Sequence, residues 1–108
     1  MRHRVLLTRH AERDLAEIHD YVSQHASPRR ATGLLAKLRD EVLKLALEPG
    51  RGSWPRELLE LGVRDFRQIS IRPYRIIYRV LEARVIVLVI VDGRRDLRLL
   101  LERRLLGG

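Results

Sequence analysis

The sequence has no cysteine among its 108 residues. Disulfides and thiolate metal sites are therefore excluded, and a chain without cysteine is typical of a reducing compartment such as the cytoplasm. All four histidines, His3, His10, His19 and His25, fall in the first quarter of the chain and lack the spacing of a metal site. We therefore expect no metal ion and no other cofactor, and we expect the histidines to be solvated on the surface.

Long apolar runs are also absent. The longest is Val85 to Val91, whereas a membrane-spanning helix needs about 20 apolar residues. The N-terminus reaches polar Thr8-Arg9-His10 too early for a signal peptide. These features predict a cytoplasmic protein without membrane contact. What the chain does contain, 45% hydrophobic and 33% charged residues, is typical of a single globular domain over 1–108.

Lysine is scarce, since only Lys37 and Lys44 are present, and yet the formal net charge is +8. Nearly all of the positive charge is therefore arginine, which binds phosphate and carboxylate groups bidentately. A genome whose base composition favours arginine codons accounts for part of this bias. It does not account for the excess of positive over negative charge, which predicts an acidic partner, either a protein or a nucleic acid.

Hydrophobic periodicity predicts the element order β-α-α-β-β-β-α. The expected ranges are a strand at 4–8, helices at 9–25 and 28–47 with Thr8 and Ser27 as N-caps, strands at 63–71, 74–81 and 84–91, and a last helix that begins after Asp92-Gly93. Segment 51–61 is expected to be a loop or short turn. The strand at 84–91 is apolar on both faces, so we expect it inside the sheet.

Short connections between the last three strands predict an antiparallel meander. The two central helices, joined by a few residues, predict an antiparallel helix hairpin. The predicted fold is therefore α+β, with a mainly antiparallel four-stranded sheet, the helix hairpin on one face, and a C-terminal helix.

Short motifs follow one another along nearly the whole chain: Thr8, Ala11, Asp14-Leu15, Ile18 and Tyr21; Pro49, Gly52 and Arg56-Glu57-Leu58; Phe66-Arg67; Pro73 through Val80; and Gly93-Arg94-Arg95-Asp96 before a leucine-rich segment. In this order and spacing they resemble the ParE/RelE superfamily of bacterial type II toxins, and within it the ParE branch. One departure is Asp92, where histidine often precedes Gly-Arg-Arg in the family pattern.

The resemblance implies a toxin that is neutralised by an antitoxin encoded beside it, here a ParD-like protein, and that reaches operator DNA only through this antitoxin. ParE-like members are associated with poisoning of DNA gyrase and with plasmid stabilisation, whereas RelE-like members cut mRNA on the ribosome. Three functions follow: gyrase inhibition by binding, ribosome-dependent mRNA cleavage, and a degenerate toxin that acts only within a repressor complex.

The chemistry of the side chains favours gyrase inhibition. RNA cleavage needs a general base and a general acid beside cationic groups. Ribonuclease relatives carry tyrosine or histidine in the C-terminal segment, but Leu99-Leu100-Leu101 stands there, and no His or Tyr follows Tyr78. Tyr74 and Tyr78 are expected to pack in the core, and Glu57 and Glu60 to be solvated. We therefore expect no catalytic residue.

Two binding surfaces are predicted. Target binding is assigned to arginines of the meander and the last helix: Arg67, Arg72, Arg75, Arg94, Arg95 and Arg98. Antitoxin binding is assigned to apolar residues of the helix hairpin and to the only tryptophan, which is expected to pack against the hairpin or to face a partner: Leu15, Ile18, Val22, Leu38 and Trp54. An acidic antitoxin segment is expected to fold over the hairpin and the basic sheet.

Overall fold

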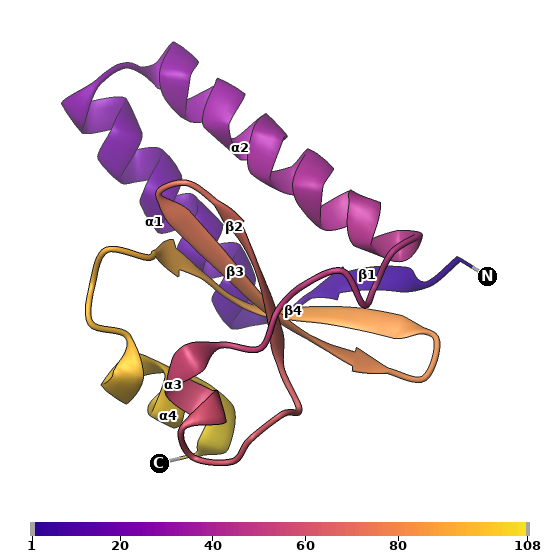
Figure 1. Ribbon diagram of the computed structural model, residues 1–108. Coiled ribbons are helices and arrows are strands. Elements are labelled where there is room, and N and C mark those ends of the chain that lie inside the picture. Colours follow the sequence, from indigo (N-terminus) through magenta and orange to yellow (C-terminus); the bar gives the residue numbers. More distant parts are fainter. Residues whose placement is uncertain (1, 108) are drawn as a thin grey trace.

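The computed structural model describes residues 2–107 and shows a four-stranded sheet with helices on both faces (Figure 1). The elements are β1 (Arg4–Leu7), α1 (Arg9–His25), α2 (Pro28–Leu43), a 3-10 turn η1 (Lys44–Ala46), α3 (Arg56–Leu59), β2 (Arg67–Ile71), β3 (Tyr74–Leu81), β4 (Arg84–Asp92) and α4 (Arg98–Leu106). The strand order is β1-β4-β3-β2, with β1 parallel to β4 and the other pairs antiparallel. The predicted α+β class and the internal position of the 84–91 strand are confirmed.

The helix hairpin begins where the sequence predicts. The Thr8 hydroxyl accepts a hydrogen bond from the Ala11 N–H at 3.1 Å, and the Ser27 hydroxyl accepts one from the Arg30 N–H at 3.1 Å. These caps satisfy N–H groups that the first turn of a helix leaves without partners. Pro28 occupies the first turn of α2, where its missing N–H costs nothing.

The predicted helix at 28–47 ends at Leu43 and continues as the 3-10 turn η1, and three further boundaries differ from the prediction by several residues. Residues 56–59 form the short helix α3, the predicted strand at 63–71 begins only at Arg67, and α4 begins at Arg98 rather than directly after Gly93. The first two differences share a cause. Gly62, at a φ of +76°, ends α3 in a left-handed turn, and the Val63 N–H donates to the Leu58 carbonyl at 2.9 Å. Residues 63–66 connect this turn to the sheet, so pairing with β3 begins only at Arg67.

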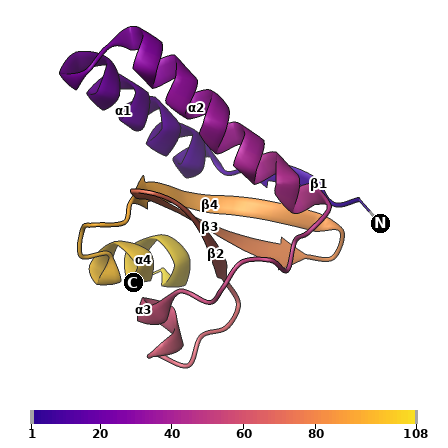
Figure 2. The same ribbon diagram turned by 45° about the horizontal axis from the view of Figure 1, so that its top comes forward.

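The sheet separates two cores, which Figure 2 shows from the side: α1 and α2 cover one face, and α3 and α4 lie on the other. The hairpin-side core comprises Ala11, Leu15, Leu38, Val42, Leu45, Ile69, Ile71, Ile76, Tyr78, Val85, Val87 and Ile90. The α4-side core comprises Leu58, Phe66, Ile77, Val89, Val91, Leu97 and Leu101. The expectation that both long helices share one face is confirmed. No helix within residues 2–107 is both long and apolar enough to cross a membrane.

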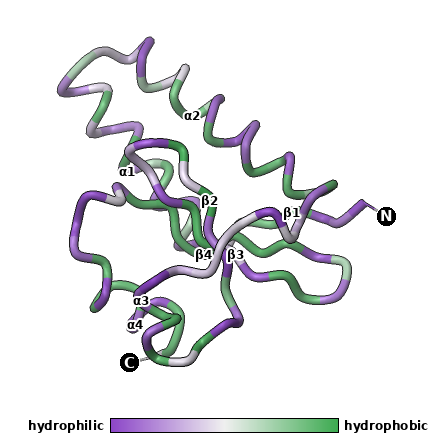
Figure 3. Tube along the Cα trace, viewed as in Figure 1, coloured by the Kyte–Doolittle hydropathy of each residue, from purple (hydrophilic) through white to green (hydrophobic). Residues whose placement is uncertain are grey.

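A bulge at Leu88 lets β4 serve both cores. The pairing with β3 passes from Tyr78–Val87 to Ile77–Val89, so Leu88 has no partner on β3. One extra residue reverses the face to which the following side chains point. Before the bulge, the odd-numbered Val85 and Val87 point into the hairpin-side core. After it, the even-numbered Ile90 points there, and Val89 and Val91 point into the α4-side core. Figure 3 shows that β4 is largely hydrophobic, as expected for a strand with a core on each face.

Tyr78 ties the loop after η1 to the sheet. Its ring is buried in the hairpin-side core, as predicted, and its hydroxyl donates to the Pro49 carbonyl at 2.7 Å and accepts from the Gly52 N–H at 3.0 Å. Gly52 is required there, because a Cβ would lie 2.6 Å from both the Tyr78 hydroxyl and the Gln68 carbonyl oxygen. Burial raises the pKa of Tyr78, so the phenol stays protonated at neutral pH.

Candidate functional site: a charged groove on the open edge of β4

β4 is longer than its neighbour β1 and leaves half of one edge open. β1 pairs with residues 84–87 of β4 and ends at Leu7, and the Thr8 N–H donates to the Val87 carbonyl at 3.0 Å just beyond it. Residues 88–92 therefore have no strand beside them on this side within the described part of the chain. An open strand edge presents backbone N–H and C=O groups to whatever approaches it.

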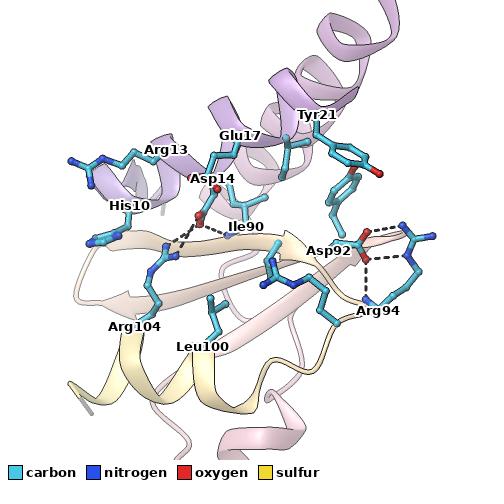
Figure 4. Close-up of a pocket in the computed structure, with 14 residues that line it drawn as sticks. His10, Arg13, Asp14, Glu17, Tyr21, Ile90, Asp92, Arg94, Leu100 and Arg104 are labelled. Carbon is cyan, nitrogen blue, oxygen red and sulfur yellow. Dashed lines mark hydrogen bonds and ion pairs between the residues drawn. The ribbon is translucent and has the colours of Figure 1, made fainter. Parts of the chain in front are cut away.

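Two side chains occupy this open edge. Asp14 of α1 accepts from the Ile90 N–H at 3.0 Å, and Arg104 of α4 donates to the Leu88 carbonyl at 2.7 Å. The two also form an ion pair, with guanidinium–carboxylate distances of 2.9 and 3.3 Å (Figure 4). The side chains of Arg104 and Asp14 are only 16% and 14% exposed. They join the first helix to the last across a strand edge that no neighbouring strand covers.

A groove of about 690 Å³ opens along this edge between α1, β4 and α4 (Figure 4). We call it the edge groove. Most of its lining residues are polar, and they come from α1, from the start of β3, from the end of β4 with the turn after it, and from α4: His10, Arg13, Asp14, Glu17, Tyr21, Tyr74, Asp92, Arg94, Arg95 and Arg104, with the apolar Ile18, Ile90, Val91 and Leu100. Among residues 2–107, no three potential ligands of the His, Cys, Asp or Glu type gather as a metal site would require.

Asp92 and Arg94 form a local ion pair at one end of the edge groove. The Asp92 carboxylate accepts from the Arg94 backbone N–H at 2.9 Å, from its Nε at 3.0 Å and from its Nη2 at 2.6 Å. These hydrogen bonds lower the pKa of Asp92 to about 2, and those from the Arg94 side chain contribute more than the one from its backbone. The same contact raises the pKa of Arg94, which remains largely exposed and accessible to a partner.

The six arginines assigned to target binding do not form one surface. Arg94 and Arg95 line the edge groove. Arg72 is exposed on the neighbouring β2–β3 turn, which the Gly93 N–H holds close by donating to the Pro73 carbonyl at 2.7 Å.

Arg75 has a structural environment instead. Its side chain is 14% exposed and pairs with the Glu57 carboxylate at 2.7 and 2.8 Å, while its Nε donates to Gln68 Oε1 at 2.9 Å. Its aliphatic stem packs against Gly93, where a Cβ would lie 2.6 Å from Arg75 Cγ and Cδ. The hydrogen bonds from Arg75 lower the pKa of Glu57, so this carboxylate stays ionised and paired with Arg75.

The remaining two arginines lie away from the groove. Arg98 is exposed at the start of α4 and pairs with Glu60 at 3.3 Å. Arg67 donates to the carbonyls of Gly50 at 3.3 Å and Gly52 at 2.8 Å. It therefore fastens the loop after η1 at the far edge of the sheet.

The residues assigned to antitoxin binding do not form one surface either. Leu15 and Leu38 are fully buried and serve the hairpin-side core. Val22 is half-buried, and Ile18 lines the edge groove. Trp54 does not pack on the hairpin: it is 43% exposed beside β2, with Arg64 and Arg67 against its ring. Of these five residues, the structure places only Ile18 in the groove.

Asp14 and Arg104 were not among the residues assigned from the sequence. A signal for Asp14 exists, because it shares the apolar stripe of α1 with Ala11, Leu15 and Ile18. A carboxylate in such a stripe needs a specific partner when the stripe is buried. Nothing in the sequence indicates that the partner lies 90 residues away, since Arg104 is one of several arginines in an amphipathic segment.

Comparison with known proteins identifies the family. Residues 5–97 match the model of the ParE toxin of the type II toxin–antitoxin system parDE. The chain belongs to the ParE toxin family. The match ends at Leu97, so α4 with Arg104 lies beyond it. Among curated protein sequences, none matches this ParE-family chain.

Solved structures agree on the fold. The chain is similar to the chromosomal ParDE toxin–antitoxin system from P. aeruginosa, with a TM-score of 0.72 and 21% identity over 83% of this chain and 95% of that one. It is also similar to the toxin–antitoxin complex RelBE2 from Mycobacterium tuberculosis, with a TM-score of 0.62 and 24% identity over 85% and 92% of the two chains. The recognised ParE/RelE-like fold is thereby confirmed.

Proposed function

We propose that this ParE-family toxin inhibits DNA gyrase by binding it, without catalysis, and that a ParD-like antitoxin neutralises it. The observation that carries the non-enzymatic half is Leu99. It is 59% exposed on α4 and stands in the segment where ribonuclease relatives carry a tyrosine or histidine. An aliphatic side chain can neither accept nor donate a proton. Position 99 therefore supplies no general acid or base beside the arginines near the start of α4.

Glu57, Tyr74 and Tyr78 are poorly suited to accept a proton. Glu57 is held by Arg75 and its pKa is lowered. Burial raises the pKa of both Tyr74 and Tyr78, so both phenols are neutral at physiological pH and cannot act as bases. Arg72, Arg94 and Arg95, by contrast, are exposed, and a set of exposed arginines suits binding to an acidic surface.

The edge groove supports an antitoxin partner. An extended segment of another chain could add to the open edge of β4 and pair with the backbone at Ile90. Acidic side chains on such a segment would face Arg13, Arg94 and Arg95, and apolar ones would face Ile18 and Leu100. The segment would have to replace the contacts that Asp14 and Arg104 make with β4.

One observation favours mRNA cleavage as a second candidate. His10, Tyr21 and Tyr74 line the same groove as Arg94 and Arg104, so a proton donor or acceptor and cations share one cavity. Tyr74, with its raised pKa, could serve only as the general acid. In that case the base would be His10 or a carboxylate of the groove.

Induction of the toxin alone in bacteria separates the two. We expect a DNA-damage response with continued protein synthesis; rapid translation arrest with cut mRNA would establish the nuclease. Changing Arg94 and Arg95 together to alanine should abolish the effect, whereas changing Arg29 and Arg30, two exposed arginines at the start of α2, removes the same charge and should not.

His10→Ala is the decisive single change. A binding inhibitor should keep its toxicity, whereas loss of a general base commonly costs about 10²–10⁴-fold in rate. Loss of toxicity in a stably folded His10→Ala protein, with the arginine pair dispensable, would replace gyrase inhibition by the nuclease. If neither DNA damage nor translation arrest follows induction, the chain acts only within a repressor complex.

A further inference from the structure

The exposed tryptophan lies outside the edge groove and outside both cores. Trp54, the only tryptophan of the chain, is 43% exposed beside the outer edge of β2. Two guanidinium groups lie against its ring: Arg64 Cζ is 5.6 Å and Arg67 Cζ is 5.5 Å from the centroid. Both distances are within the range of a cation–π contact. A large apolar ring that stays exposed beside two cations is a feature that neither core explains.

The segment that carries Trp54 is held rigidly. Ser53 forms a two-way backbone bridge with Gln68, with N···O distances of 3.0 and 2.6 Å. Gly52 is fixed by the Tyr78 hydroxyl, and Arg67 holds the carbonyls of Gly50 and Gly52. Pro55 follows directly and is buried. The indole is therefore presented from a fixed backbone, and a partner would not have to order this loop when it binds.

The charge around the ring is uncompensated. Within the described residues, no carboxylate lies within salt-bridge distance of Arg64 or Arg67, a property that they share with other arginines such as Arg72 and Arg95, whereas Arg75 and Arg104 have acidic partners. Arg64 is exposed. A guanidinium that lies over a ring uses its face for that contact, so the N–H groups of Arg64 remain available to an anion such as phosphate, whereas Nη1 of Arg67 already donates to the carbonyls of Gly50 and Gly52.

We propose that Trp54, Arg64 and Arg67 form a binding site for single-stranded nucleic acid, with an unpaired base stacked on the indole–guanidinium cluster and its phosphates bound by the arginines. Stacking on aromatic side chains next to cations is the general mode by which proteins hold single strands. A duplex keeps its bases stacked inside and cannot use the indole. An acidic peptide could use the charge but offers few planar groups for the ring. This site goes beyond gyrase inhibition and does not depend on it.

The single tryptophan makes the test specific, because the tryptophan fluorescence of the 108-residue chain reports on this site alone. Titration with a 12-nucleotide oligo-dT at low salt should quench the emission. In parallel, the anisotropy of labelled oligo-dT gives the affinity of each variant. Alanine at a base-stacking aromatic costs about 1–3 kcal/mol, which is roughly 5- to 150-fold in affinity. We expect about a 10-fold loss for Trp54→Ala and near-retention for Trp54→Phe.

Arg64→Gln should weaken binding several-fold and reduce the salt dependence by about one phosphate contact. The matched control, Arg29→Gln, removes one exposed arginine at the start of α2 and should bind as the parent does. A 12-base-pair duplex and a poly-glutamate of equal charge should each bind at least about 10-fold more weakly than oligo-dT. Circular dichroism melts confirm that the variants are folded.

Several results would overturn the site: oligo-dT binding without quenching, equal losses for Trp54→Ala and Arg29→Gln, duplex or poly-glutamate binding as tight as oligo-dT, or no binding at low salt.

Discussion

The two faces of the sheet are built in different ways. On the hairpin side, two long helices cover a large apolar core, in which Tyr78 is the only fully buried residue with a hydroxyl group among residues 2–107. On the other side, a nine-residue and a four-residue helix cover a smaller core, which is flanked by the mostly buried pair Arg75–Glu57 and the exposed pair Arg98–Glu60. A further pair, Arg104–Asp14, joins α4 to α1 across the edge of the sheet. Apolar burial is insensitive to an approaching partner, whereas ion pairs can be exchanged for contacts with that partner. The hairpin side therefore supplies stability, and the α4 side presents the charges of the groove.

Matched truncations in the two cores test this comparison with the largest expected effects. Leu38 and Leu101 are both fully buried, one in each core. Burial losses of this kind cost about 2–5 kcal/mol. We expect Leu38→Ala to lie in the upper half of that range and Leu101→Ala in the lower half, because the short terminal helix can shift to fill its cavity. Urea unfolding measures both, and a larger loss for Leu101→Ala would contradict the division between the faces.

The Arg104–Asp14 pair gives the next largest effect. Arg104→Ala leaves the Leu88 carbonyl and the mostly buried Asp14 carboxylate without their partner. Removal of one member of a buried pair costs about 3–5 kcal/mol, and partial exposure reduces this to about 2 kcal/mol. Amide exchange should accelerate across α4 and remain slow in α2.

Arg103→Ala is the control for this change, because Arg103 is the exposed neighbour of Arg104 and should alter stability by less than about 0.5 kcal/mol. In a double-mutant cycle, Asp14→Asn should add less to Arg104→Ala than to the parent. Full additivity would show that the two side chains are not coupled.

Two glycines sharpen the comparison within the hairpin side. Gly52→Ala places a methyl group 2.6 Å from the Tyr78 hydroxyl and the Gln68 carbonyl, and should cost about 1–3 kcal/mol because the loop must move. Gly33→Ala lies in the middle of α2 with no atom within 4 Å and should stabilise the protein by about 0.5–1 kcal/mol. Thermal unfolding distinguishes the two, and opposite signs are the expected result.

The smallest effect belongs to Asp92 and Arg94. The folded-state pKa of Asp92, about 2, lies below its ordinary value of 3.8. A lowered pKa means that the stabilisation is complete above pH 3.8 and is lost as the pH falls towards 2. Because the pair is solvated, its contribution should be less than about 1 kcal/mol. The stability difference between the parent and Arg94→Gln should therefore shrink as the pH falls from 3.8 towards 2 and vanish only below pH 2, and an NMR titration of Asp92 with an ordinary midpoint would contradict the contact.

Much of the fold can be read from local patterns. The hairpin helices, both N-caps, the meander and the internal strand all depend on spacing within short segments, and the structure has each of them. Residues 56–66 were harder, because a four-residue helix leaves no periodic signal and its end depends on the left-handed conformation of Gly62.

The site was less predictable for a different reason. Arg67, Arg75, Arg94 and Arg104 are chemically identical in the sequence, but one fastens a loop, one is held by Glu57, one lines the groove and one caps a strand edge. For Arg67, Arg75 and Arg104, the partners Gly52, Glu57 and Asp14 lie 15, 18 and 90 residues away, whereas Arg94 pairs with Asp92 two residues before it. Charge counting identifies a basic protein, and only the three-dimensional arrangement shows which charges are free.

The parallel pairing of β1 with β4 also has a consequence for synthesis. β2, β3 and β4 are joined by short turns and can associate as soon as they emerge, whereas β1 must wait for residues 84–87. Contacts of such sequence separation form late, because the chain between them must first be ordered. The edge groove needs Arg94 and Arg95, and its far wall needs Arg104. A nascent or truncated chain that ends before α4 therefore lacks part of the surface on which toxicity is proposed to depend, and the edge groove is complete only after α4 has been synthesised.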